Sequence, residues 1–111
     1  MDYRASIRYC RISPTKVRNL ANLVRGRSAR VGLETLRYLP HRGARLLEKA
    51  LRSAIANAED RDVRNADSLI VVSAGVDTGP TLKRIQPHAR GMGFMIKKRM
   101  SHITVSLSLP E

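Results

Sequence analysis

A segment without acidic residues constrains this chain more than any other feature of its sequence. Between Gly79 and His102 the sequence GPTLKRIQPHARGMGFMIKKRMSH carries six lysines and arginines and no aspartate or glutamate. Strand-like apolar patterns flank it, a continuous run at residues 69–76 and an alternating one at residues 103–109. Because two residues are enough to join antiparallel strands, the long cationic insert is expected to leave the core.

The insert has the composition of a twisted β-ribbon. Its glycines and prolines suit turns and bulges, whereas Ile85, Phe94 and Ile96 suit strands. We place its tip near Ile85–Gly91, and ten residues at about 3.3 Å each would project roughly 30 Å. A two-stranded ribbon of that length is not stable alone in water, so a partner must cover it. The alternative is a disordered basic loop that keeps the protein soluble.

The charge of the whole chain indicates the same kind of partner. Its 111 residues include 21 Lys and Arg against 9 Asp and Glu, a formal net charge of +12. Sixteen of these cations are arginines, whose planar guanidinium matches phosphate geometry. This excess favours a nucleic acid as partner, with a membrane surface as the alternative. No apolar run approaches the roughly eighteen residues of a membrane span, and no membrane partner is expected.

The N-terminal sequence and the cysteine content bear on location. The stretch MDYRASIRYC has no apolar signal region. Cys10 is the only cysteine, so an internal disulfide is impossible and a reducing, cytoplasmic setting is the default.

The N-terminal residues predict a half-buried strand. Apolar and polar residues alternate over residues 3–9, with Arg4, Ser6 and Arg8 on the polar face. A period of two is typical of a strand with one face in the core. The residues expected on the buried face are Tyr3, Ala5, Ile7 and Tyr9.

Three helices are expected next. Ser13 is a favourable N-cap, Pro14 suits a first turn, and Gly26 can end the helix in the left-handed conformation. Ser28 is expected to cap a second helix, which Pro40 ends. The third helix has an unbroken apolar stripe, made of Leu47, Ala50, Leu51, Ala54, Ile55 and Ala58. Its solvent side is expected to carry Arg45, Glu48, Lys49 and Arg52.

These elements predict one α+β domain over residues 1–111. Three helices would pack on a small antiparallel three-stranded sheet, from which a long β-hairpin protrudes. The globular part would comprise about residues 1–76 and 103–111, and the basic hairpin about residues 77–102. Residues 60–68 are expected to form a polar loop.

Catalysis is not expected. His41, His88 and His102 lie far apart in the sequence, and none has metal-ligand spacing with Cys10. No phosphate-binding G-x-x-x-x-G-K pattern and no glycine-flanked nucleophile occurs. The sequence therefore predicts no enzyme, no metal and no cofactor.

Four motifs carry a resemblance to a known family. RISPTKVRNLANLVRG, SAIANAE, DTGPTLKRIQPHARG and KKRMSHITV occur in this order. From about Ala5 to Leu107 the chain resembles the universal large-subunit ribosomal protein number twenty-two, of the bacterial or organellar type. The resemblance implies a structural constituent of the large ribosomal subunit that binds several domains of 23S-type ribosomal RNA and supports subunit assembly. It also implies a cytoplasmic, or organellar, ribosome as the location.

The resemblance also implies partners and site residues. The hairpin tip would line the nascent-peptide exit tunnel and meet the nascent peptide, and the chain, a monomer within the ribosome, would adjoin other large-subunit proteins near the exit. The implied rRNA-binding residues are Arg11, Lys16, Arg18, Lys83, Arg84, Arg90, Lys97, Lys98, Arg99 and His102. The implied tip is Leu82, Lys83, Arg84, Ile85, Gln86, Pro87, His88, Ala89, Arg90 and Gly91.

Two other classes of function fit the charge pattern. One is an architectural DNA-binding protein that inserts a basic β-ribbon into the minor groove and usually works as a dimer. The other is a basic adaptor for acidic proteins.

Overall fold

The computed structural model describes the backbone of residues 2–87 and 93–109, and the side chains of residues 2–81 and 99–109. The elements are β1 (Tyr3–Cys10), α1 (Pro14–Val24), α2 (Ala29–Arg37), α3 (Arg42–Asp60), the 3-10 helix η1 (Ala66–Ser68), β2 (Ile70–Pro87) and β3 (Gly93–Ser108). This α+β order, with three helices and a small antiparallel sheet, confirms the predicted fold class. Within the described residues no helix is long and apolar enough to cross a membrane.

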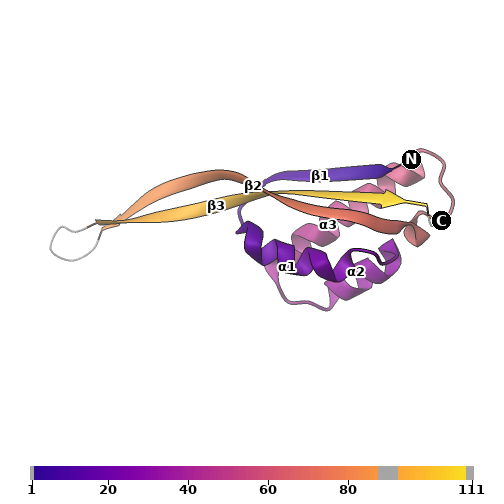
Figure 1. Ribbon diagram of the computed structural model, residues 1–111, viewed down its shortest axis with the longest axis horizontal. Coiled ribbons are helices and arrows are strands. Elements are labelled where there is room, and N and C mark those ends of the chain that lie inside the picture. Colours follow the sequence, from indigo (N-terminus) through magenta and orange to yellow (C-terminus); the bar gives the residue numbers. More distant parts are fainter. Residues whose placement is uncertain (1, 88–92, 110–111) are drawn as a thin grey trace.

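The sheet has the strand order β1-β3-β2, so β3 lies in the centre. Strand β1 stops pairing with β3 at Cys10 and Ser101, whereas β2 pairs with β3 as far as Pro87 and Gly93. Beyond Ser101 the two long strands therefore continue as a two-stranded ribbon, which extends away from the helices in Figure 1. The molecule measures 63 × 24 × 19 Å, and its radius of gyration is 16.9 Å, against about 13 Å for a compact chain of this length.

The hydrophobic core lies between the sheet and the three helices, which all cover the same face of it (Figure 1). The whole predicted stripe of α3 is buried, and its alanines allow the helix to lie close to the sheet. Opposite it, Val71, Val105 and Leu107 are at most 1% exposed. Burial of a large aliphatic side chain contributes about 1.5–3 kcal/mol, so this layer stabilises the globular part.

The predicted position of Tyr9 in the core is wrong. Tyr3 and Ala5 are buried as expected, but Tyr9 is 60% exposed and Cys10 is buried in its place. The register with β3 shifts between Ile7 and Cys10, and Tyr9 has a φ of 58°. A β-bulge adds a residue to one strand, and one extra residue moves each following side chain to the other face.

The prediction that Glu48 lies on the solvent side of α3 is also wrong. Glu48 is 6% exposed, and its carboxylate forms ion pairs with Arg45 at 2.9 Å and with Arg52 at 2.6 Å. Arg45 in turn donates to the carbonyl oxygens of Leu36, Arg37 and Leu39, where α2 ends. Glu48 is thus buried beneath two half-exposed arginines, one of which bonds to the end of α2.

The helix ends agree with the sequence in part. The Oγ of Ser28 accepts from the N–H of Val31 and caps α2. Ser13 precedes α1 but makes no side-chain hydrogen bond to its first turn. Gly26 has the expected left-handed conformation, with a φ of 84°. Within the predicted polar loop the structure adds η1, preceded by Asn65 in the left-handed region.

Candidate nucleic-acid interface

The ribbon brings its cations together on successive rungs of the β2–β3 ladder. Lys97, Lys98 and Arg99 of β3 lie opposite Lys83, Leu82 and Thr81 of β2, so two lysines face each other directly. Opposed like charges destabilise an antiparallel pair, and residues 79–102 include no acid to compensate. This arrangement is suited to a polyanion that contacts both strands.

The structure places only part of the predicted tip. Arg84 lies one rung further out than Lys83, opposite Ile96. Arg90 and the tip residues His88, Ala89 and Gly91 lie outside the described residues.

A β-bulge marks the point where the ribbon leaves the three-stranded sheet. The register shifts between Thr78 and Thr81, around Gly79 and Pro80. A Cβ atom on Gly79 would lie 3.2 Å from the backbone carbonyl of Met100, closer than ordinary van der Waals contact. Glycine therefore favours this close approach of the two backbones, and the bulge increases the local twist.

His102 fastens the end of β1 to the base of the ribbon. Its Nδ1 accepts a hydrogen bond from the backbone N–H of Tyr9 at 3.0 Å, and the two rings meet edge to face with centroids 4.9 Å apart. Since Nδ1 is the acceptor, the neutral imidazole carries its proton on Nε2. The predicted RNA-binding residue thus has a structural contact as well, and only Nε2 is left to donate to a partner.

Arg18 has a second role that its sequence position did not reveal. It is exposed, and its Nε donates to the carbonyl oxygen of Val76 at 3.1 Å. Arg25, the C-cap residue of α1, lies two helical turns further on and donates to the carbonyl oxygen of Ala74 at 2.8 Å. Both acceptors belong to β2, one of the two edge strands, so these two arginines cover an edge that could otherwise pair with another chain.

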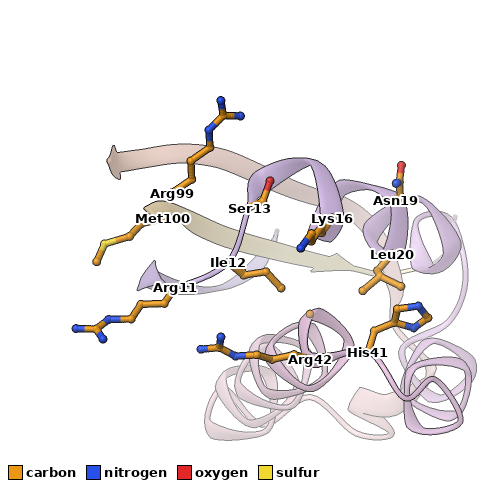
Figure 2. Close-up of a pocket in the computed structure, with 11 residues that line it drawn as sticks. Arg11, Ile12, Ser13, Lys16, Asn19, Leu20, His41, Arg42, Arg99 and Met100 are labelled. Atoms are coloured by element: carbon orange, nitrogen blue, oxygen red, sulfur yellow. The ribbon is translucent and has the colours of Figure 1, made fainter. Parts of the chain in front are cut away.

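A pocket of about 750 Å³ opens at the base of the ribbon, between the start of α1 and the start of α3 (Figure 2). It unites three of the predicted RNA-binding residues, Arg11, Lys16 and Arg99, with Arg42 and His41. No acidic residue lines it. The pocket therefore concentrates positive charge from three separate parts of the chain.

Both helices that begin at this pocket carry cations, and no acid, in their first turns, which is unfavourable for an isolated helix. Neither α1 nor α3 has an acid in its first turn, and neither N-cap residue makes a side-chain cap. The free N–H groups and the dipole of a helix N-terminus attract anions and disfavour cations. Lys16 and Arg42 stand there nonetheless. A basic first turn was the signal by which sequence reasoning could have found Arg42.

Cys10 is a buried free thiol. Burial raises the pKa of its thiol above the ordinary value of 9.0, and the positive charges of Lys49 and Arg42 only partly oppose this. Its S–H group donates to the carbonyl oxygen of Ile7 at 3.7 Å. A thiol that stays protonated is neither a nucleophile nor a metal ligand. In the part of the chain that the structure describes, no group of three potential ligands could hold a metal ion.

Comparisons with known proteins agree with each other. A family model described as ribosomal protein L22p/L17e matches residues 5–108. A large ribosomal subunit protein uL22 from Desulfosudis oleivorans is 53% identical over 94% of this chain and 90% of its own length. One from Rhodopirellula baltica is 51% identical over 96% and 94%, and uL22c from Euglena gracilis is 46% identical over 98% and 94%.

Proposed function

The chain belongs to the ribosomal protein L22p/L17e family, and on that premise we propose that its acid-free ribbon binds the ribosomal RNA of the large subunit. Family membership makes it a structural protein of the large subunit, associated with that subunit and its RNA on the cytoplasmic ribosome, and not an enzyme. The match confirms the resemblance found in the motifs. It favours the ribosomal interpretation over the DNA-bending and adaptor alternatives.

The observation that carries the proposal is the opposition of cations on an unsupported ribbon. Lys83 and Lys97 face each other in a segment without acids, and beyond Ser101 no third strand pairs with the described part of β3. A two-stranded ribbon is only marginally stable in water, and opposed like charges destabilise it further. Phosphates on both sides of it would supply the missing stabilisation.

The mechanism follows from this charge arrangement. Cations on both strands screen phosphates that converge from different RNA segments, which allows those segments to pack together and supports subunit assembly. Phosphate contacts position a protein without reading bases, so recognition is of folded RNA shape. The interface continues onto the globular part at Arg11, Lys16 and Arg18, with Lys98, Arg99 and His102 at the base of the ribbon.

The salt dependence of RNA binding tests the proposal. The triple variant Lys83→Ala, Arg84→Ala, Lys97→Ala should remain folded, because these residues belong to the two-stranded ribbon and not to the three-stranded sheet, but bind a large-subunit RNA fragment more weakly. The slope of log K against log salt is negative, and each lost phosphate contact reduces its magnitude by about 0.7–0.9. Loss of three contacts should therefore make the slope about 2 less steep.

A matched variant controls for net charge. Arg27, Arg37 and Arg64 are exposed cations of the globular part, and their replacement by alanine removes the same charge. The salt slope of this control variant should stay close to that of the unaltered chain. Equal slopes for the two triple variants would show that the RNA responds to total charge and not to the ribbon.

The tip has a separate proposed role, implied by the family. Residues 82–91 would line the nascent-peptide exit tunnel, near neighbouring large-subunit proteins, and contact the nascent peptide. A molecule 63 Å long with its helices at one end has the reach for this. Ribosomes whose chain lacks Leu82–Arg84 should assemble but respond differently to macrolides. An unaltered response in fully assembled subunits would contradict the role of the tip.

A further inference from the structure

The pocket at the base of the ribbon has two chemically different parts. Arg11 and Arg42 extend to the same side of its mouth, and the amine of Lys16 points inward between α1 and α3 (Figure 2). The aliphatic side chain of Ile12 lies among these cations, and that of Leu20 lies further along the cavity, beyond Lys16, with His41 beside it. A cationic mouth and an apolar floor thus share one cavity.

The floor is closed by tight packing. A Cβ atom on Gly43 would lie 3.0 Å from Cδ1 of Leu20 and 3.2 Å from Cδ1 of Ile12. The start of α3 therefore rests directly on these two side chains, and a larger residue at this position would have to displace them slightly. This contact gives the cavity an apolar wall.

The size of the pocket limits its occupant. A volume of about 750 Å³ falls in the range of pockets for small molecules, about 300–1,000 Å³, so a helical RNA segment cannot enter. Proteins bind unpaired RNA bases by splaying them out against apolar, aromatic or histidine side chains, while cations hold the backbone. A single nucleotide has a phosphate that suits the cationic mouth of this cavity and a base that suits its apolar floor.

We propose that the pocket binds one unpaired nucleotide extruded from the ribosomal RNA. Its phosphate lies between Arg11 and Arg42, near the first turns of α1 and α3, and its base packs on Ile12 and the ring of His41. This inference rests on the proposed function, and it adds to it. The ribbon reads RNA shape through phosphates, whereas the pocket requires a base that is free of a helix.

An abasic probe separates base binding from phosphate binding. The full chain is titrated with a fluorescent single-stranded RNA pentanucleotide and with the same oligonucleotide carrying an abasic site at its centre, which has equal charge. Base packing on protein side chains is expected to make the intact oligonucleotide bind at least about fivefold more tightly. Equal affinities would overturn the inference.

Variants of the pocket locate the effect. His41 is exposed and makes no side-chain cap, so its replacement should leave α3 intact. His41→Ala should reduce the preference for the intact oligonucleotide, and His41→Phe should preserve it by keeping a ring. The double variant Arg11→Ala, Arg42→Ala should bind both oligonucleotides more weakly and with a less steep salt dependence. A preference that survives in both the His41→Ala and the Arg11→Ala, Arg42→Ala proteins would place base binding elsewhere and refute the inference.

Two further measurements keep this inference distinct from the proposed function. The ribbon variant Lys83→Ala, Arg84→Ala, Lys97→Ala should retain the preference for the intact oligonucleotide, although it binds the large RNA fragment weakly. If the preference is absent while the ribbon variant still shows its lower salt slope, only the pocket inference fails. A polyglutamate peptide of equal charge serves as the competing anion. If it displaced the oligonucleotide at equal concentration, the pocket would be a general anion site and the inference wrong.

Discussion

Strands β2 and β3 pass through two environments, which meet at the bulge between Thr78 and Thr81. Over residues 70–78 and 101–108 they are part of a three-stranded sheet with helices on one face, and Val71, Val105 and Leu107 are buried. Over residues 81–87 and 93–99 the same two strands pair only with each other. The two strands pair with each other in both halves. Only the inner half has a third strand beside it and helices packed over its apolar face.

The two regions also treat their charges differently. In the globular part, Arg30 pairs with Asp67 at 2.9 Å, Arg45 and Arg52 share Glu48, and the arginines of α1 bond to strand carbonyls. In the ribbon, residues 79–102 contain no acid at all. A cation with an internal partner contributes to folding, whereas one without can contribute its full attraction to an external anion. The sign of a side chain's charge therefore says less about its role than the neighbours that the fold supplies.

The largest expected difference between the regions is in apolar truncation along β3. Ile103 is fully buried, so Ile103→Ala should lower the free energy of unfolding by about 2–5 kcal/mol. Ile96, in the ribbon opposite Arg84, is the matched site. Ile96→Ala should change the free energy of unfolding by less than about 0.5 kcal/mol. Urea denaturation measures both, and similar losses would mean that the ribbon forms part of the cooperative core.

The next largest effect concerns the charge cluster of the globular part. Glu48→Gln keeps the shape of the side chain but removes the carboxylate shared by Arg45 and Arg52. The free energy of unfolding should fall by about 1–2 kcal/mol and not by more, because the arginines are about half exposed and remain partly solvated. Glu59→Gln, at an exposed position of the same helix, is the control and should be close to neutral. If the two glutamine variants unfolded at the same urea concentration, Glu48 would have no special structural role.

The smallest expected effect comes from removal of the ribbon. A chain in which Asn-Gly replaces residues 80–99 retains β1, the inner halves of β2 and β3, and all three helices. Its free energy of unfolding should change by less than about 1 kcal/mol, because a shorter loop costs little to close, while RNA affinity should fall strongly. Failure of this shortened chain to fold would contradict our division into a globular part and a basic hairpin of residues 77–102.

Much of the fold could be predicted because its signals are local. The stripe of α3 and the Ser28 cap follow from residues a few positions apart, and both are confirmed. The ribbon was predicted from an excess of length and a lack of acids between two apolar strands. Its cations could be identified in the same way, but not the rungs on which they meet, because register depends on the bulges at both ends of the sheet.

The candidate site was predicted only in part, since its pocket is made by distant segments. Arg11 and Lys16 were identified through a motif, and Arg99 through another, but nothing in the sequence placed them around one cavity. His41 and Arg42 join them only because α3 begins beside the first turn of α1. Their one sequence signal, a helix start without acids, acquires its meaning from the cavity next to it.

The amino-acid sequence by itself determined which faces are apolar, where helices can begin and end, and that one long segment is purely cationic. These properties belong to side chains and to their spacing along the chain. Only the tertiary structure decided which charges are neutralised and which stay available. It also decided that Tyr9 leaves the core to meet His102, 93 residues away. The physical reason is that periodicity specifies a face, whereas a contact requires two faces to meet in one register.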